Sequence, residues 1–316
     1  MAWLNVRSKF LTKLLQRSIH AFDRSITHRV ATTTNPVFQI KLPEDQYIRV
    51  GVIKTRYWSA GTKGSPLILL HGGGSSIEVW TYNFDALAQN HQVYAFDMVG
   101  SGLSDKPELP YSLDYQVQFL TDFMNALNID KANIIANSMG GGIILKFALK
   151  YPERIGKIVL ISSLGLGKEI SIYHRFLAAV PVIAKFAQPS RFGAKLMLKK
   201  NVYNPKAIPS EWVENSFQRF KMPGRKQALI SILKTNLNLG GVREEVFMPI
   251  VQQLAHIRAP TLIIWGNQDA VLPVTHAHIA NKYIPNTSLH IFDKCGHWPH
   301  VEYPQKFNQL VLKFLH

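Results

Sequence analysis

The chain has 316 residues, 47% of them hydrophobic and 11% aromatic, so it can bury a large core as one enzyme-sized domain with an insertion or as two small domains. Its 36 Lys and Arg outnumber 20 Asp and Glu, and the formal charge of +16 favours anionic partners such as membrane surfaces or nucleic acid. Cys295 is the single cysteine, which excludes an internal disulfide and a multi-cysteine metal cluster and suits a reducing compartment.

The first thirty residues form a strongly basic segment, with six Lys and Arg against the single acid Asp23. Its apolar residues recur at helical spacing, at Trp3, Leu4, Phe10, Leu11, Leu14 and Leu15. This pattern predicts a basic amphipathic helix, followed by a linker that ends at residue 35. The helix is interpreted as an anchor on an anionic membrane surface, with an organellar transit peptide or a helix packed on the protein itself as alternatives.

Residues 36–164 and 259–316 show buried strands that alternate with helices. A strand pair is expected within 47–57, and continuous apolar runs predict strands at 66–70, 93–96, 134–136, 158–161, 261–265 and 288–292. Helical patterns lie between these runs, at 115–127, 140–150, 276–283 and 304–314. The alternation predicts an α/β fold with a doubly wound, mostly parallel sheet covered on both faces.

The alternation stops between residues 165 and 258. Helical patterns at 170–187, 210–219 and 227–236 follow one another without buried strands, and Gly240-Gly241 breaks the last of them. This segment holds 15 Lys and Arg against five Glu, so much of the basic excess lies here. We expect an inserted helical cap that divides the core into two sequence segments.

The segment Ile134–Gly142 places Ser138 between an apolar run and a glycine cluster, a pattern typical of a strand, a sharp turn and a helix. Such a turn holds the serine in a strained backbone conformation at the carboxyl end of the strand, where only small neighbours fit. Ala136 stands where the G-x-S-x-G consensus has its first glycine. The alternative is a serine that merely begins a helix, so the interpretation depends on catalytic partners elsewhere.

A serine hydroxyl needs a base to take its proton, and the base needs a carboxylate to fix its tautomer. His297 follows the last predicted strand, and Asp269 follows the strand before it, so both are expected at the carboxyl ends of strands. The chain order Ser138, Asp269, His297 is the nucleophile, acid, base order of hydrolase sheets. Asp293 competes as the acid, but a loop cap is the better interpretation so close to His297.

An oxyanion intermediate needs preorganised donors, usually two backbone N–H groups. We expect one from Met139 in the turn after Ser138 and the other from Gly73 in the loop His71–Gly74. A phosphate-binding loop is the rival interpretation, but the spaced Gly-Lys-Ser/Thr of that motif is missing. His and acidic residues show no metal-ligand spacing, so neither a metal nor a cofactor is predicted.

Taken together, the motifs resemble the α/β-hydrolase superfamily from about Tyr47 to the end of the chain. They are HGGG at 71, DMVGSGLSD at 97, ANSMGG at 136, APTLIIWGNQD at 259 and CGHW at 295. The resemblance implies a serine hydrolase with a catalytic triad, an oxyanion hole and a cap domain.

Within this superfamily, the sequences around Ser138 and His297 are similar to meta-cleavage-product hydrolases, which split carbon–carbon bonds in dienoates. That resemblance implies that Asn137 and Trp298 contact the substrate, and we expect Gly74 of the glycine loop to do so too. The turn is also similar to that of membrane-associated monoacylglycerol lipases. The cap segment that carries a carboxylate-binding Arg in the first group has its nearest Arg at 219 here, which favours the second group.

We therefore expect hydrolysis of a carboxylic ester with an apolar or lipid-derived acyl group, through an acyl-enzyme on Ser138. A carbon–carbon bond hydrolase of meta-cleavage-product type and a non-catalytic ligand-binding protein on the same scaffold remain as alternatives. The expected partner is a small-molecule ester. Nucleic acid is not expected, because the net charge favours it but no recognition motif does. A cytoplasmic location with peripheral attachment to a membrane surface fits this interpretation.

Overall fold

The computed structural model describes residues 43–180 and 188–316. The amphipathic helix expected in residues 1–30 lies outside the described residues, and so does the last part of the helix expected at 170–187.

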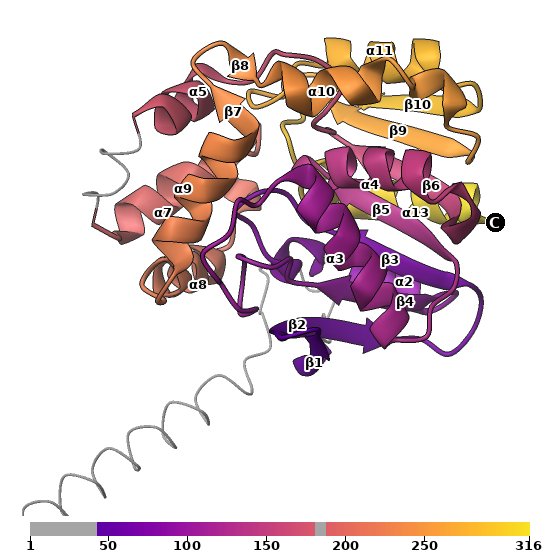
Figure 1. Ribbon diagram of the computed structural model, residues 1–316, viewed down its shortest axis with the longest axis horizontal. Helices are drawn as coiled ribbons and strands as arrows, with labels where there is room; N and C mark the ends of the chain where they lie inside the picture. Colours follow the sequence, from indigo (N-terminus) through magenta and orange to yellow (C-terminus); the bar gives the residue numbers. More distant parts are fainter. Residues whose placement is uncertain (1–42, 181–187) are drawn as a thin grey trace, which may run out of the picture. The chain divides into compact units, whose positions relative to one another are not determined.

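An eight-stranded sheet forms the core (Figure 1), and its strand order is β1-β2-β4-β3-β5-β6-β9-β10. The strands are β1 (Gln46–Val50), β2 (Ile53–Ala60), β3 (Pro66–Leu70), β4 (Gln92–Phe96), β5 (Ala132–Asn137), β6 (Ile155–Ile161), β9 (Thr261–Gly266) and β10 (Thr287–Phe292). β2 pairs antiparallel with β1 and with β4, and every other neighbouring pair is parallel. The predicted mostly parallel sheet is confirmed.

The strands are apolar throughout because both faces of the sheet are covered. Along β3, Ile68 and Leu70 belong to the hydrophobic cluster on one face, and Leu67 and Leu69 belong to the cluster on the other. The first face is covered by α3 (Leu113–Ala126), α4 (Met139–Lys150) and α11 (Thr275–Tyr283), and the second by α2 (Phe84–Ala88) and α13 (Pro304–Leu315). This arrangement is the doubly wound fold that the alternation of strands and helices predicts.

The remaining core elements are short. They are the 3-10 helices η1 (Ile77–Trp80), η2 (Pro152–Arg154) and η4 (Leu254–His256), and the helix α12 (Pro299–Glu302). Within the described part of the chain, none of the helices combines the length and the apolar character needed to cross a membrane.

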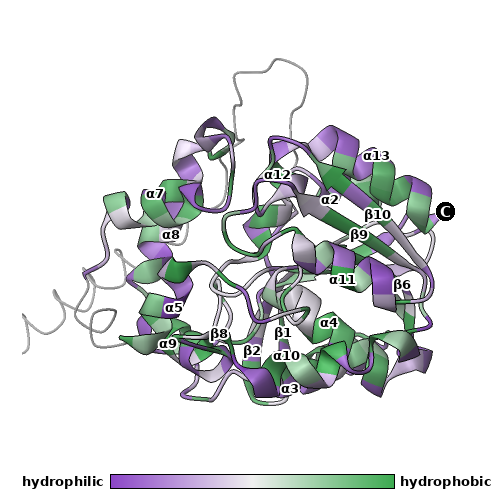
Figure 2. Cartoon of the chain, turned by 90° about the horizontal axis from the view of Figure 1, so that it is seen from above, coloured by the Kyte–Doolittle hydropathy of each residue, from purple (hydrophilic) through white to green (hydrophobic). Residues whose placement is uncertain are grey.

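The segment between β6 and β9 is mainly helical. It contains α5 (Ile172–Ala179), α7 (Arg191–Lys199), η3 (Pro205–Ala207), α8 (Ser210–Phe220), α9 (Arg225–Asn236) and α10 (Glu244–Val251). In two perpendicular views, α5, α7, α8 and α9 gather to one side of the sheet (Figures 1 and 2). One detail differs from the prediction of an all-helical segment: the break at Gly240-Gly241 closes a two-residue hairpin between β7 (Leu237–Asn238) and β8 (Gly241–Val242), because Gly241 adopts φ +129°.

Candidate active site

Ser138 lies directly after β5, in the sharp turn that the sequence predicts. Its φ of 56° and ψ of −119° are a strained conformation for a residue with a side chain. The backbone around it fixes this turn, because Ser138 N donates to Ile161 O at 3.0 Å and Ser138 O accepts from Leu164 N at 2.9 Å. The residue is partly exposed at the end of the strand, whereas its neighbours Asn137 and Met139 are buried.

The glycines after Ser138 are required by close packing. A Cβ on Gly141 would lie 2.2 Å from Ser163 Oγ, and a Cβ on Gly140 would lie 2.9 Å from His71 O. Because both distances are below any normal contact, helix α4 can start at this point only with glycines in its first turn.

Asp269 and His297 come together at the carboxyl ends of β9 and β10. His297 Nδ1 lies 2.8 Å from Asp269 Oδ2, and their side chains are 2% and 0% exposed. The other carboxylate oxygen, Asp269 Oδ1, accepts from Val271 N at 2.8 Å and Leu272 N at 3.0 Å. An ionised Asp269 therefore accepts the Nδ1 proton of His297 and leaves Nε2 available as a base.

The competing acid, Asp293, is placed elsewhere. Its carboxylate accepts hydrogen bonds from the side-chain amides of Gln268 at 2.9 Å and Asn267 at 3.3 Å. These bonds hold the pKa of the exposed Asp293 below its usual value. The structure thus brings Asp269, and not Asp293, to the imidazole of His297.

Within the described residues, the Ser138 hydroxyl makes no hydrogen bond to His297. Contacts between a nucleophile and its base are often long without substrate and tighten when substrate binds. The catalytic roles of Ser138, Asp269 and His297 stay predictions.

The glycine loop after β3 lies over the turn that holds Ser138. A Cβ on Gly73 would lie 3.3 Å from Met139 Sδ, and a Cβ on Gly72 would lie 3.5 Å from Ser138 Oγ. Ser75 N donates to Gly72 O at 3.1 Å, which closes a turn with Gly74 at φ +76°. The structure therefore brings together Gly73 and Met139, the two residues predicted to supply oxyanion donors.

His71 ties the glycine loop to the loop after β4. Its Nε2 accepts from Met98 N at 3.1 Å, so the proton is on Nδ1, which donates to Gly72 O at 2.8 Å. Burial lowers the pKa of His71, which keeps the ring neutral and this pair of bonds intact. Asp97 adds a second link, because its Oδ1 accepts from Ile77 N at 2.9 Å.

The predicted substrate contacts Asn137 and Trp298 are both buried next to the candidate triad. Asn137 Nδ2 donates to Ile161 O and to His297 O, each at 3.2 Å, so it holds the loop that carries the imidazole. The Trp298 ring meets the ring of Trp212 from α8 edge to face, with centroids 6.3 Å apart. Trp298 therefore joins the core to the cap, and contact of either residue with substrate stays a prediction.

His174 of α5 is a neighbour of the site that the sequence does not single out. Its Nδ1 lies 2.6 Å from Ser171 Oγ. Burial, the positive potential of His297 and the charge of Lys200 lower the pKa of His174 to about 4, while Asp269 opposes the shift. His174 is one of twelve histidines, and its electrostatic interaction with His297 and Asp269 distinguishes it.

An ion network links the cap to the core beside the glycine loop. Arg219 of α8 donates to Glu78 and, at 2.9 Å, to Ser76 Oγ. Glu78 also accepts from Arg56 at 2.7 Å, and Arg56 lies 3.2 Å from Asp97. Burial raises the pKa of Glu78, but the two guanidinium groups outweigh it and hold the pKa well below its usual range.

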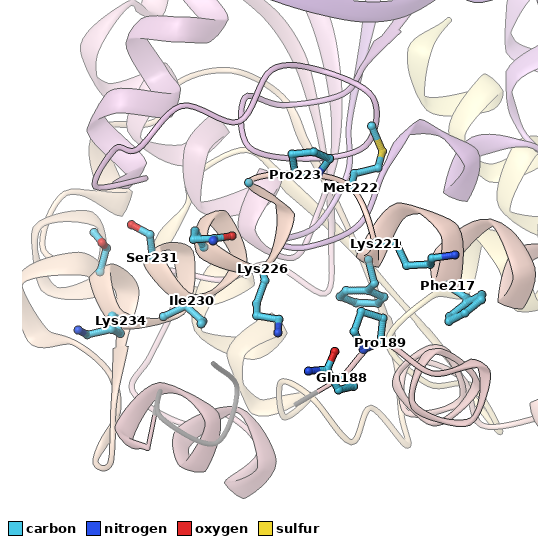
Figure 3. Close-up of a pocket in the computed structure, with 14 residues that line it drawn as sticks. Gln188, Pro189, Phe217, Lys221, Met222, Pro223, Lys226, Ile230, Ser231 and Lys234 are labelled. Atoms are coloured by element: carbon cyan, nitrogen blue, oxygen red, sulfur yellow. The ribbon is translucent and has the colours of Figure 1, made fainter. Parts of the chain in front are cut away.

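One large cavity among the described residues is lined by none of the triad residues. It is an open groove of about 1050 Å³ on the cap, between α8, α9 and the segment Gln188–Pro189 (Figure 3). A smaller cavity of about 60 Å³ lies beside the glycine loop and is lined by residues that include Gly74, Trp212, Arg219 and Arg225. Gly74 of the glycine loop lines the smaller cavity, whereas no residue of that loop lines the groove.

Comparison with known proteins agrees with this geometry. Residues 65–304 match the family described as alpha/beta hydrolase fold. The 2-hydroxy-6-oxononadienedioate/2-hydroxy-6-oxononatrienedioate hydrolase of Burkholderia vietnamiensis is 30% identical over 292 residues, which cover 89% of this chain and 99% of that protein. The 2-hydroxy-6-oxo-6-(2'-aminophenyl)hexa-2,4-dienoic acid hydrolase of Metapseudomonas resinovorans is 30% identical over 275 residues, or 86% and 90% of the two chains.

A solved structure is similar over the same range. The meta-cleavage product hydrolase of Pseudomonas fluorescens (CumD) superimposes with a TM-score of 0.70 at 29% identity, and the match covers 86% of this chain and 97% of that chain.

These names contradict the expected carboxylic ester hydrolase, and that prediction is wrong: the similar proteins are named for dienoate substrates, so the carbon–carbon alternative is better supported. The motifs could not separate the two, because the same nucleophile, base and oxyanion donors serve both reactions. The choice depended on a missing cap arginine, and one absent side chain does not decide which bond a triad breaks.

Proposed function

The chain belongs to the alpha/beta hydrolase fold family, and on this premise we propose that it hydrolyses a carbon–carbon bond in a 2-hydroxy-6-oxo-dienoate. The observation that carries the proposal is the similarity to named dienoate hydrolases over nearly the whole of their length. The site supports it, because the glycine loop contacts Ser138 and Met139 and its Gly74 lines a cavity between core and cap.

In the proposed reaction, Ser138 attacks the 6-oxo carbon and His297 takes the hydroxyl proton. The N–H groups of Gly73 and Met139 stabilise the resulting oxyanion. The bond breaks in the 2-oxo tautomer of the substrate, which forms when the 2-hydroxyl loses its proton and C5 gains one. When the intermediate collapses, the C5–C6 bond breaks, its electron pair leaves on C5 as a dienolate conjugated with the 2-oxygen, and His297 returns its proton to that fragment. Water, deprotonated by His297, then releases the acid from Ser138. Asp269 orients His297 throughout.

The test uses 2-hydroxy-6-oxo-6-phenylhexa-2,4-dienoate, whose conjugated system loses its visible absorbance on cleavage. We expect equimolar benzoate, measured by chromatography, and a kcat/KM well above that for a phenyl ester of similar size. Ser138→Ala is expected to lower benzoate release by about 10⁴-fold or more. Ester turnover without any benzoate from the dienoate would overturn the proposal.

The small-molecule substrate is the partner that this proposal requires. Attachment of residues 1–30 to an anionic membrane surface is a separate proposal that depends on the sequence pattern alone, since that segment lies outside the described residues.

A further inference from the structure

Arg225 is the first residue of α9 and extends from the cap to the core. Arg225 is buried, with 4% of its surface exposed. The guanidinium donates from Nη2 to Gly74 O and from Nη1 to Gly100 O, the latter at 3.2 Å. Gly74 lies in the loop after β3, and Gly100 lies in the loop after β4. One cap side chain therefore holds both loops beside the candidate oxyanion site.

The bond to Gly74 acts on the turn that carries Gly73. The peptide unit between Gly74 and Ser75 is fixed at both ends, because Ser75 N donates to Gly72 O at 3.1 Å and Gly74 O accepts from Arg225. A peptide held by its N–H and its carbonyl cannot rotate without losing one of the two bonds. Arg225 therefore fixes the Gly74–Ser75 peptide, whose N–H in turn holds Gly72 O, the carbonyl of the peptide that carries the Gly73 N–H.

Helix α9 also packs on this turn directly. A Cβ on Gly74 would lie 3.0 Å from Leu229 Cδ1 and 3.7 Å from Arg225 Nη2. The bonds of His71 and Asp97 join the two loops within the core, whereas Arg225 reaches them from the cap. Any displacement of α9 would withdraw this contact from the glycine loop.

The electrostatic setting of Arg225 is unusual for a purely structural arginine. Within residues 43–180 and 188–316, no carboxylate forms an ion pair with it, and its acceptors are backbone carbonyls. Burial and the nearby Arg219 lower its pKa to about 10, so the guanidinium is still charged at neutral pH. A buried charge without a carboxylate partner is costly, and charge-assisted bonds to two carbonyls recover only part of that cost.

We propose that Arg225 is a positioning residue that couples the cap to the oxyanion loop, so that the Gly73 donor is correctly placed only when α9 is seated on the core. The inference builds on the proposed function, which assigns the oxyanion donors. It concerns the transition state rather than substrate binding, and it therefore predicts a fall in kcat with a smaller change in KM.

The test measures how fast a fluorophosphonate labels Ser138. In this reaction Ser138 Oγ forms a bond to phosphorus, fluoride leaves with the P–F electron pair, His297 takes the hydroxyl proton, and the phosphoryl oxygen needs the oxyanion donors. No dienoate is involved, so the readout is independent of which substrate the protein cleaves. Folded protein is verified by circular dichroism, and labelling is measured well below the melting temperature of each variant.

Arg225→Met keeps the length of the side chain and removes its charge and donors. We expect its labelling rate to fall about 10- to 100-fold, less than the loss of a whole oxyanion donor. Arg225→Lys should give an intermediate rate, because an ammonium cannot bridge the two carbonyls as a guanidinium fork does. Arg191→Met is the matched control, since Arg191 of α7 is 65% exposed and pairs with Glu214, and its rate should equal that of the unaltered protein.

The outcomes separate the two proposals. If a folded Arg225→Met or Arg225→Lys variant labels at the unaltered rate, the positioning role is wrong and the proposed function stands. If the unaltered protein labels and Arg225→Met slows, but the dienoate is not cleaved, the positioning role stands and the carbon–carbon substrate is wrong. If the unaltered protein does not label at all, both are wrong.

Discussion

His297 Nδ1 and Asp269 Oδ2 are 2.8 Å apart, and both side chains are sealed from solvent. The geometry specifies which atom faces which, because Asp269 Oδ1 is already used by two backbone N–H groups, those of Val271 and Leu272. Only one carboxylate oxygen is left for the imidazole. The tautomer of His297 therefore depends on whether the atom at the Oδ2 position of residue 269 accepts or donates a hydrogen bond.

The first prediction concerns a substitution that changes this atom from an acceptor to a donor. In Asp269→Asn, the amide oxygen should keep the bonds to Val271 N and Leu272 N, so the NH₂ group faces His297 Nδ1. The imidazole must then hold its proton on Nε2, where it cannot act as a base. We expect kcat for dienoate cleavage to fall by about 10³–10⁴-fold with little change in stability. Asp293→Asn, measured in parallel, should be unaffected, and equal losses in the two variants would contradict the assignment.

The second prediction concerns the glycines behind Ser138. Gly141→Ala would place a Cβ 2.2 Å from Ser163 Oγ, so α4 or the segment after β6 must shift. Overpacking of this kind costs about 1–3 kcal/mol, and we expect a lower unfolding free energy in urea together with slower fluorophosphonate labelling. Gly193→Ala in α7 is the control, because its Cβ would meet only the N-cap hydroxyl of Ser190, at 3.1 Å, and no backbone atom. That variant should lose much less stability than Gly141→Ala.

The third prediction is a pH dependence of stability. Burial and the charge of His297 lower the pKa of His300 from 6.5 to about 3, and its ring packs on Trp80 at a tilt of 34°, with centroids 4.6 Å apart. The unfolded chain therefore takes up the proton first as the pH falls. The stability that the neutral His300 contributes is fully present above pH 6.5 and is lost as the pH falls towards 3. Over this range the free energy of unfolding falls by up to about 1.4 kcal/mol per pH unit.

His300→Phe keeps a flat ring on Trp80 and removes this proton. We expect urea unfolding of this variant to depend less steeply on pH between 6.5 and 3, the two pKa values of His300. His278→Phe, at an exposed position of α11, should leave the slope unchanged. Identical slopes for His300→Phe and the unaltered protein would exclude the assignment.

The sequence was sufficient for the sheet, for the turn that holds Ser138 and for the placement of Asp269 and His297 at the carboxyl ends of neighbouring strands. Parallel strands bring their carboxyl ends to one edge, so residues that directly follow separate apolar runs must meet there. The glycine loop could be placed beside Ser138 by the same reasoning.

The cap contacts could not be found in this way. Arg225 and His174 lie on helices whose orientation depends on packing across the insertion, and no periodic pattern states which side chain reaches the core. The motifs also do not predict which bond is cleaved, because ester and carbon–carbon hydrolysis use the same triad residues and the same Gly73 donor. Only the relatives distinguished the two.

The fourth prediction tests the basic segment at the start of the chain. Each Lys or Arg near an anionic membrane contributes about 1 kcal/mol to binding, so six of them beside an apolar stripe should hold the protein on vesicles rich in anionic lipid. Sedimentation with such vesicles should retain the full chain, and a version that lacks residues 1–30 should stay in solution. Binding should weaken as salt is added. Equal sedimentation of both versions would remove the membrane interpretation.

The fifth prediction concerns the ion pair between Glu78 of the core and Arg219 of the cap. Glu78→Gln removes the negative charge that Arg219 and Arg56 share, whereas Arg219→Met leaves Glu78 paired with Arg56 at 2.7 Å. We therefore expect Glu78→Gln to lower the unfolding free energy more than Arg219→Met does. The double variant should show a coupling energy of about 0.5–3 kcal/mol, because the two groups are largely buried.

The control for this cycle is Arg191 with Glu214, a cap pair whose side chains are 65% and 43% exposed. Solvent and salt screen such a pair, so its coupling should not exceed about 1 kcal/mol. Both pairs join an arginine to a glutamate, and they differ in burial. A difference between the two coupling energies therefore measures the effect of burial on the ion pair. If Glu78 and Arg219 coupled no more strongly than the exposed pair, the ion network would contribute nothing specific to seating the cap, and Arg225 would be left as its main polar tie to the glycine loop.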